Sequence, residues 1–257
     1  MKKIPFLVLS SDKYSDLWDS FYECFKKKFP KDVKIYFGSN SKPNTNPNVL
    51  PILSGPDKNW SESFKKILDQ IDEEYLVVIL EDLFFFKETS NAKWGEIEDF
   101  CIDNKVNYFR YFFFQSHDLI KNKNICSNLD FGIPFRLTVC GIWKRSTLQS
   151  LLINGETAWE FEIMGSYRAR DLKGFYTTNY PVLNCKNMVE KGMWIPKSVK
   201  WAKDNNINLD LGARKYPNFF QSIIMKFKKI LFETIIKVPW KYRVYLSSLI
   251  KRILISY

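Results

Sequence analysis

The sequence predicts an α/β protein in which helices flank a mostly parallel sheet, followed by a basic helical tail. Short apolar runs alternate with amphipathic stretches through the first 90 residues, which favours strand–helix–strand units. One of these runs, residues 76–80, is apolar throughout. Such a run is typical of a strand that is buried on both faces of a parallel sheet. A strong excess of Lys and Arg over acidic residues near the C-terminus indicates the basic tail.

The chain has 257 residues, enough for one large domain with a sizeable core and a short appendage. Aromatic residues make up 17% of it, so we expect a folded body and not a disordered chain. We expect the domain to span residues 1–217 and the tail residues 218–257.

The cysteine and histidine content excludes several classes of site. The five cysteines show no C-x-x-C spacing, which argues against a zinc site and a disulfide framework and favours a reducing cytoplasm. His117 is the single histidine, so His-rich metal sites and a Ser-His-Asp triad are nearly excluded. We expect neither a signal peptide nor a membrane-spanning helix, since no apolar run approaches ~18 residues.

The N-terminal elements can be assigned in order. Residues 6–9 are expected to form a strand, followed by a polar loop over residues 10–12. Ser15 or Asp16 then caps a helix that ends before Pro30. Further strands are expected at residues 33–37 and 49–53, with a Ser-, Asn- and Pro-rich loop between them.

The next unit carries the strongest chemical signal. Asn59 and Glu62 have capping-box spacing and open a predicted helix over residues 60–71. The apolar strand then ends abruptly in Glu81 and Asp82. Ligands of parallel sheets lie beyond the carboxyl ends of the strands, where two desolvated acids need a partner. That partner is expected to be a divalent cation or a basic group.

After residue 90 the pattern is less regular. Arg110 interrupts an apolar strand, where it pairs with a carboxylate or phosphate or else lies on an edge strand. The expected elements are a helix at 94–102, a strand at 107–114, a loop at 116–130, a strand at 137–143 and a helix at 146–152.

A second acidic cluster lies between residues 155 and 170. Glu156, Glu160 and Glu162 surround Trp159, and Arg168 follows. On an ideal helix Glu156 and Glu160 share a face, whereas Glu162 is turned about 200° away from Glu160. An acid beside aromatic rings can have a raised pKa and act as a general base. A purely structural Glu–Arg network is the alternative, and the sequence leaves both open.

The tail combines apolar bulk with positive charge. Residues 218–257 hold eight Lys or Arg and one acid, Glu233. Apolar residues recur at three- and four-residue steps up to Pro239, and a second helix is expected at 242–255. This pattern is typical of an amphipathic helix on an anionic membrane surface. Packing of the tail on the body is the alternative; nucleic acid is disfavoured because large aliphatics, not stackable aromatics, separate the basic residues.

Four sequence segments together resemble glycosyltransferases of the GT-A type, most closely those of bacterial capsule and O-antigen biosynthesis. They are SSDKYSDLW, GPDKNWSESFKKIL with EEYLVVILEDLFFF, and GETAWEFEIMGSYR, within residues 5–195. The resemblance implies a GT-A-like, Rossmann-type, mostly parallel sheet. It also implies transfer of a sugar from a nucleotide-sugar donor to a lipid-linked or growing surface glycan.

The resemblance also implies site residues. Asp82 would bind the donor diphosphate through Mn²⁺ or Mg²⁺, although the chain has Glu81-Asp82-Leu83 where the family often has D-x-D. The spacing to Arg168 favours Glu162 over Glu160 as the base. The expected donor-binding residues are Ser10, Ser11, Asp12, Tyr14, Asp57, Trp60, Ser61, Glu81, Asp82 and Arg168.

The expected location is the cytoplasmic face of the plasma membrane, where lipid-linked acceptors are found. Phe227, Lys228, Lys229 and Trp240 are expected to contact the membrane. Two other classes stay open: a metal-dependent phosphotransferase or nuclease, and a non-catalytic, membrane-associated partner of a polysaccharide assembly complex. The first needs a third acid at Glu81 and Asp82, and the sequence shows none clearly placed there.

Overall fold

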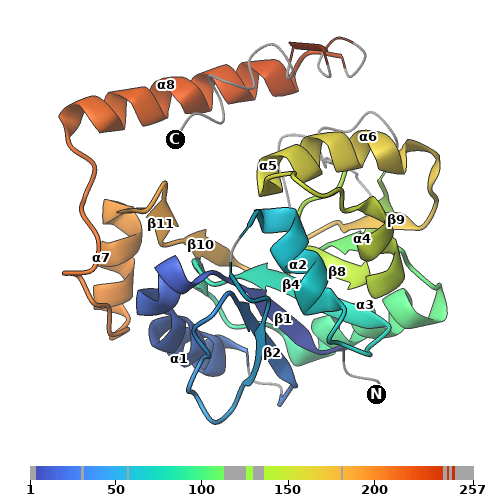
Figure 1. Cartoon of the computed structure of the whole chain (residues 1–257), viewed down its shortest axis with the longest axis horizontal. Coiled ribbons are helices and arrows are strands. Elements are labelled where there is room, and N and C mark those ends of the chain that lie inside the picture. Colours follow the sequence, from blue (N-terminus) through green and yellow to red (C-terminus); the bar gives the residue numbers. More distant parts are fainter. Residues whose placement is uncertain are drawn as a thin grey trace.

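The central feature of the fold is an eight-stranded sheet flanked by helices (Figure 1). The computed structural model describes residues 4–29, 32–56, 58–112, 126–129, 136–180, 182–239, 242 and 245–246. The strand order is β3-β2-β1-β4-β8-β6-β9-β7. The strands are β1 (Phe6–Leu9), β2 (Ile35–Ser39), β3 (Leu50–Leu53), β4 (Tyr75–Leu80), β6 (Tyr108–Arg110), β7 (Cys126–Asn128), β8 (Gly141–Lys144) and β9 (Phe175–Thr178).

Six of these strands run in one direction, and only β7 and β8 are antiparallel to their neighbours. The predicted fold class, a mostly parallel α/β sheet flanked by helices, is therefore confirmed. Smaller pairings join β5 (Leu83–Phe85) to β10 (Cys185–Asn187) and β11 (Val189–Glu190) to β12 (Met193–Trp194).

Helices cover both faces of the sheet because alternate residues of each strand point to opposite sides. Phe6 and Val77 face one core, together with α1 (Trp18–Lys28), α3 (Asn91–Asp103) and α7 (Pro196–Asp204). Leu7 and Leu76 face the other, together with α2 (Trp60–Leu68) and α4 (Arg145–Leu151). Strand β4 is buried along nearly its whole length, as its apolar sequence predicts.

Several predicted elements are confirmed and others are corrected. Strands β1, β3 and β4 and helices α2 and α3 form where expected, with Asn59 capping α2 through its side chain. The first helix does not begin at Ser15 or Asp16. A 3₁₀ turn over Asp12–Leu17 precedes it, and the Asp16 carboxylate binds Arg214 instead. Residues 126–128, predicted as loop, form the edge strand β7, and residues 116–125 lie outside the described residues.

The strand predicted at 137–143 begins only at Gly141. The backbone N–H groups of Leu137, Thr138 and Val139 bind side chains instead of a neighbouring strand. At Gly141, an added Cβ would lie 2.2 Å from the Tyr108 ring, so only glycine lets β8 pass this close to β6. The backbone of residues 137–139 is therefore used to bind side chains, and strand pairing begins only at Gly141.

The described part of the tail contains a long helix, α8 (Phe219–Ile236), which Figure 1 shows as a rod apart from the sheet. Its apolar residues remain exposed: Phe219 is 75% exposed, Phe227 61% and Ile230 63%. The alternative in which this face packs on the body is therefore not observed. Among the described residues, none of the helices combines the length and apolar character needed to cross a membrane. Most of the second predicted helix, at 242–255, lies outside those residues.

Candidate functional site

Glu81 and Asp82 form the turn between β4 and β5, at the carboxyl end of the parallel strands. Glu81 is only 5% exposed, and Asp82 is half-buried. Burial, and then the neighbouring Asp82, raises the pKa of Glu81 well above its usual range. Burial raises the pKa of Asp82 to about 6. The positive charge of Arg214 opposes both shifts.

The loop after β1 lies against this acid pair. The Trp18 indole N–H donates to Ser10 Oγ at 2.8 Å, and the Ser10 hydroxyl lowers the pKa of Glu81. The Asp12 carboxylate accepts hydrogen bonds from the backbone N–H groups of residues 40–42 at 3.0–3.1 Å. Asp12 thus joins this loop to the one after β2 and shapes it. The Tyr14 N–H donates to the Ser11 carbonyl at 2.9 Å, which closes the turn.

Arg214 completes this side of the site, and the sequence analysis missed it. Its Nε and Nη2 donate to the two carboxylate oxygens of Asp16 at 2.7 Å each. Nη2 also donates to the Lys13 carbonyl at 3.0 Å, and the guanidinium lies 4.3 Å from the Tyr14 ring centroid. The ion pair is nearly closed to solvent, with side chains 8% and 16% exposed. A residue from the far end of the chain therefore holds the loop after β1 in place.

Glu162 lies on a π-helical turn, Phe161–Gly165, between α5 (Ala158–Glu160) and α6 (Ser166–Arg168). Such turns occur often at functional sites because they change the direction of one side chain. Its Oε1 accepts the Val139 N–H at 3.0 Å. Burial raises the pKa of Glu162 to about 7, and the Val139 hydrogen bond opposes that rise. The carboxyl group is thus poised near neutral pH.

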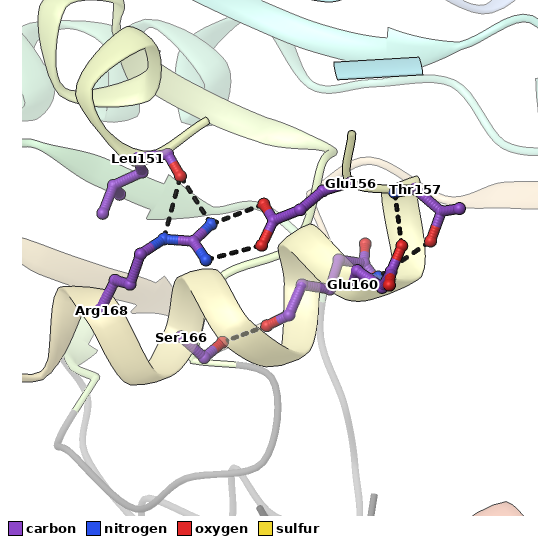
Figure 2. A network of polar contacts seen from close by, with 7 residues as sticks. Leu151, Glu156, Thr157, Glu160, Ser166 and Arg168 are labelled. Carbon is purple, nitrogen blue, oxygen red and sulfur yellow. Dashed lines mark hydrogen bonds and ion pairs between the residues drawn. The ribbon is translucent and has the colours of Figure 1, made fainter. Parts of the chain in front are cut away.

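The neighbouring charged residues form a structural brace (Figure 2). Arg168 binds both carboxylate oxygens of Glu156, at 2.7 and 2.8 Å, and donates twice to the Leu151 carbonyl. Glu160 and Thr157 form a reciprocal capping box at the start of α5. The Glu–Arg network weighed from the sequence therefore exists, and the Glu162 carboxylate takes no part in it, whereas the Glu162 carbonyl accepts the Ser166 hydroxyl. The catalytic role of Glu160 and the donor-binding role of Arg168 stay predictions.

The start of α2 packs against the turn that carries Glu162. The Trp60 ring lies 5.7 Å from the Phe161 ring, between centroids. Ser61 is buried, and its hydroxyl donates to Asn59 Oδ1 at 2.9 Å while its backbone N–H donates to the Glu156 carbonyl. Both residues thus help to position this turn. Asp57 lies outside the described residues.

Cys140 lies directly before β8, next to Val139, whose N–H binds Glu162. Its buried thiol has a raised pKa, first through burial, then through the nearby charge of Glu162, and also through that of Asp82. Val78 of β4 pairs with Gly141, and Val139, two residues before Gly141, donates its N–H to Glu162, so the end of β4 and the Glu162 turn lie at the same end of the sheet. The predicted membrane residues are elsewhere, on α8: Phe227 is exposed and Lys228 is partly exposed. The Lys229 side chain and Trp240 lie outside the described part of the chain.

No protein-family model matches the sequence, and no curated protein matches it. Among solved structures, the chain is similar to residues 1–349 of S. aureus TarS, at 12% identity and a TM-score of 0.45. That match covers 68% of this chain and 60% of the other. TarS has also been crystallised with UDP and with UDP-GlcNAc.

The apo form of the glycosyltransferase GlyE of Streptococcus pneumoniae is also similar, at 10% identity and a TM-score of 0.39. This match covers 92% of the chain and 65% of GlyE. The chain thus spans about two thirds or less of the length of these proteins. TM-scores below 0.5 do not establish a common fold, so the assignments below depend on the geometry of this chain.

Proposed function

We propose that the protein is a glycosyltransferase that moves a sugar from a nucleotide-sugar donor to a hydroxyl of a glycan or glycolipid acceptor. The observation that carries the proposal is the separation of two acidic environments on one edge of the sheet. Asp82 lies in the turn after β4, where the charge of Arg214 favours its ionised form, whereas Glu162 lies on the π-helical turn and has a pKa of about 7. Sugar transfer needs both: a site for a charged leaving group and a base for the acceptor.

In this scheme Glu162 removes the proton from the acceptor hydroxyl as that oxygen attacks the anomeric carbon. The bond between the anomeric carbon and the nucleoside diphosphate breaks, and the departing phosphate takes the electron pair. A base with a pKa of about 7 is ionised in a useful fraction of molecules at neutral pH. Ser10 and Tyr14, on the loop that Arg214 holds, line the side where the nucleotide would lie.

A divalent cation fits this site only if the donor supplies ligands. In the described residues, no three His, Cys, Asp or Glu side chains lie together as a metal-binding group. Mg²⁺ and Mn²⁺ accept carboxylate oxygens, and Mg²⁺ often uses one or two carboxylates together with substrate phosphates. Asp82 would hold the ion from the protein side, since burial favours the neutral form of Glu81. When bound, the ion would neutralise charge on the diphosphate.

Replacing Asp82 tests the donor site directly. We expect a nucleotide among UDP-, GDP-, CMP- and dTDP-linked compounds to stabilise the protein, by ~2.7 kcal/mol at ~100 times its dissociation constant. Asp82→Ala should remove most of this stabilisation, because the diphosphate site is lost. The measurement is a thermal-shift screen with and without Mn²⁺. Asp171→Ala, which changes an exposed acid, is the control and should keep the shift.

Failure of every nucleotide to shift the melting temperature would contradict the transferase. It would favour the non-catalytic partner of an assembly complex. A shift that is equal in Asp82→Ala and in the wild type would place the nucleotide at another site.

We also propose that α8 brings the site to an anionic membrane that carries the acceptor. In the described part of this helix, the exposed large apolar side chains are Phe219, Phe220, Ile223, Ile224, Phe227 and Ile230. Lys226 lies beside them and is exposed as well. An exposed apolar face of this size, next to positive charge, matches anionic lipid by both packing and charge.

Serine substitutions at Phe220 and Phe227 test this surface in the full-length chain. We expect each to weaken binding to anionic vesicles by about tenfold, since each removes an aromatic ring from the interface. Folding should not change, because both rings are exposed in the protein. Vesicle co-sedimentation is the measurement. Leu50→Ser, at an exposed leucine of β3, is the control, and equal loss in the control would contradict the assignment.

A further inference from the structure

Two lysine ammonium groups lie over one aromatic ring next to the β5–β10 pairing. The Nζ atoms of Lys186 and Lys87 are 5.0 and 5.9 Å from the centroid of the Phe86 ring. Lys186 Nζ also lies 5.6 Å from the Trp201 ring centroid, so it contacts two rings. The negative face of an aromatic ring attracts an ammonium group, and this attraction restricts where the two charges lie. The surface therefore presents positive charge at defined positions.

Hydrogen bonds between neighbouring elements hold the two rings around this ammonium group. Phe86 directly follows β5, and its backbone N–H donates to the Asn184 carbonyl, just before β10, at 2.9 Å. Helix α7 carries Trp201 and is joined to β10, because the Ser198 hydroxyl donates to the Asn187 carbonyl at 2.6 Å. Both rings remain partly exposed, so a ligand on the surface can reach the lysines between them.

The positive charge of this surface is not balanced by ion pairs within the described residues. In that part of the chain, no carboxylate oxygen lies within 4.0 Å of the Nζ atoms of Lys87, Lys186 or Lys197. Lys197 is exposed one turn before Trp201, on the same face of α7. Glu88 follows Lys87 directly, but its side chain is exposed to solvent. An anionic ligand would thus bind these lysines without first breaking an ion pair.

This surface continues into the proposed donor site. Strand β5 begins directly after Asp82, and the Asp82 carbonyl accepts the Met188 N–H, just beyond β10, at 2.8 Å. The β5–β10 pairing therefore runs from the acid pair to Phe86. Four residues of extended chain span about 13 Å. A ligand that lies along the pairing would have one end at the donor site and the other over the lysines.

We propose that Phe86, Lys87, Lys186 and Trp201 bind an acidic glycan, whose sugars carry carboxylate groups, and that this glycan is the acceptor. The inference rests on the proposed function and adds the class of acceptor to it. Lysine ammonium groups bind carboxylate oxygens through charge-assisted hydrogen bonds. Single-stranded nucleic acid instead stacks its bases on open ring faces, whereas ammonium groups already lie over the Phe86 ring. This arrangement favours a ligand that is bound by its charge.

The test measures binding of hexagalacturonate, an acidic hexasaccharide, to the full-length protein by calorimetric titration without nucleotide. The double variant Lys87→Gln, Lys186→Gln removes both charges over Phe86, and we expect its affinity to fall about fivefold. The control Lys66→Gln, Lys173→Gln removes two charges from exposed positions on α2 and before β9, and should stay within about twofold of the wild type. Equal losses in the two variants, or equally tight binding of neutral maltohexaose, would overturn the site.

Two further ligands decide whether the partner is a glycan. If oligothymidylate binds the wild type more tightly than hexagalacturonate and loses more affinity in Lys87→Gln, Lys186→Gln, the surface takes nucleic acid and the glycan assignment is overturned. The assignment is equally overturned if this variant loses affinity for phosphatidylglycerol vesicles and keeps its affinity for hexagalacturonate.

The nucleotide response separates this surface from the donor site. The rise in melting temperature with nucleotide should be unchanged in Lys87→Gln, Lys186→Gln, because neither lysine belongs to the donor site. Absence of that rise in the wild type would reject the transferase and with it the acceptor role. The hexagalacturonate titration tests the binding surface by itself.

Discussion

Replacing Glu162 by glutamine should slow sugar transfer strongly and yet make the protein more stable at pH 8. Glutamine cannot accept the acceptor proton, so we expect a loss of about 10²–10⁴ in rate. It can still accept the Val139 N–H, so the local hydrogen bond survives. The pKa of Glu162 in the folded protein is about 7, above its ordinary value of 4.5. Burial of the charged form therefore opposes folding at high pH.

The sign of the stability effect follows from this raised pKa. The stabilisation belongs to the protonated acid, so it is fully present below about pH 4.5 and is lost as the pH rises through about 7. Glutamine stays neutral, so the variant should gain at most ~3 kcal/mol over the wild type above pH 7 and nothing near pH 4. Burial, together with the charge of Glu162, raises the pKa values of Tyr108 and Cys140, so neither changes charge in this range.

Denaturant unfolding at pH 5 and pH 8, together with transfer rates, measures both effects. Wild-type activity should rise with pH through about 7 and then level off. Glu160→Ala serves as the control, because it breaks the capping box at a cost of about 1 kcal/mol and should retain activity. If Glu160→Ala is inactive and Glu162→Gln is active, the general base is Glu160 and not Glu162.

Replacing Arg214 by alanine should lower the free energy of unfolding by about 3–5 kcal/mol. Breaking a buried ion pair on one side leaves an uncompensated charge, here on Asp16. The variant should also bind nucleotide more weakly, because Tyr14 and Lys13 lose the guanidinium that positions their loop. Thermal or urea unfolding and nucleotide titration are the measurements.

A double-mutant cycle separates the ion pair from the other contacts of Arg214. Adding Asp16→Ala to Arg214→Ala should cost less than the sum of the two single changes, since it removes the orphaned carboxylate. Arg214→Lys should fall between the wild type and the alanine variant, because lysine keeps the charge but not the two-pronged geometry. If Arg214→Ala has the same free energy of unfolding as the wild type, the Asp16 carboxylate does not need the ion pair. That result would contradict the structural role of Arg214.

Local sequence patterns predicted the positions of several central strands and helices correctly. Apolar runs located β1 and β4, and the Asn59 signal located the start of α2, because burial and capping leave marks within a few residues. The position of Glu81 and Asp82 at a sheet edge followed from β4 alone. The tail helix was equally evident from its spacing.

The rest depends on contacts that no local pattern records. Arg214 is 198 residues from Asp16, and nothing in its own neighbourhood marks it as a partner of the loop after β1. The orientation of Glu162 was estimated on an ideal helix, whereas a π-helical turn carries it. Likewise, β8 begins late because side chains from elsewhere occupy the N–H groups of residues 137–139.

Gly141 is constrained by its neighbours although it has no side chain that could take part in the reaction. Its missing side chain leaves room for the Tyr108 ring, whose hydroxyl accepts the N–H of Thr138, next to the N–H that Glu162 accepts at Val139. Any larger residue would displace the ring and, through two peptide units, the Glu162 carboxylate that we propose as the base. In a mutational survey, position 141 would thus behave like an active-site position although it bears no functional group.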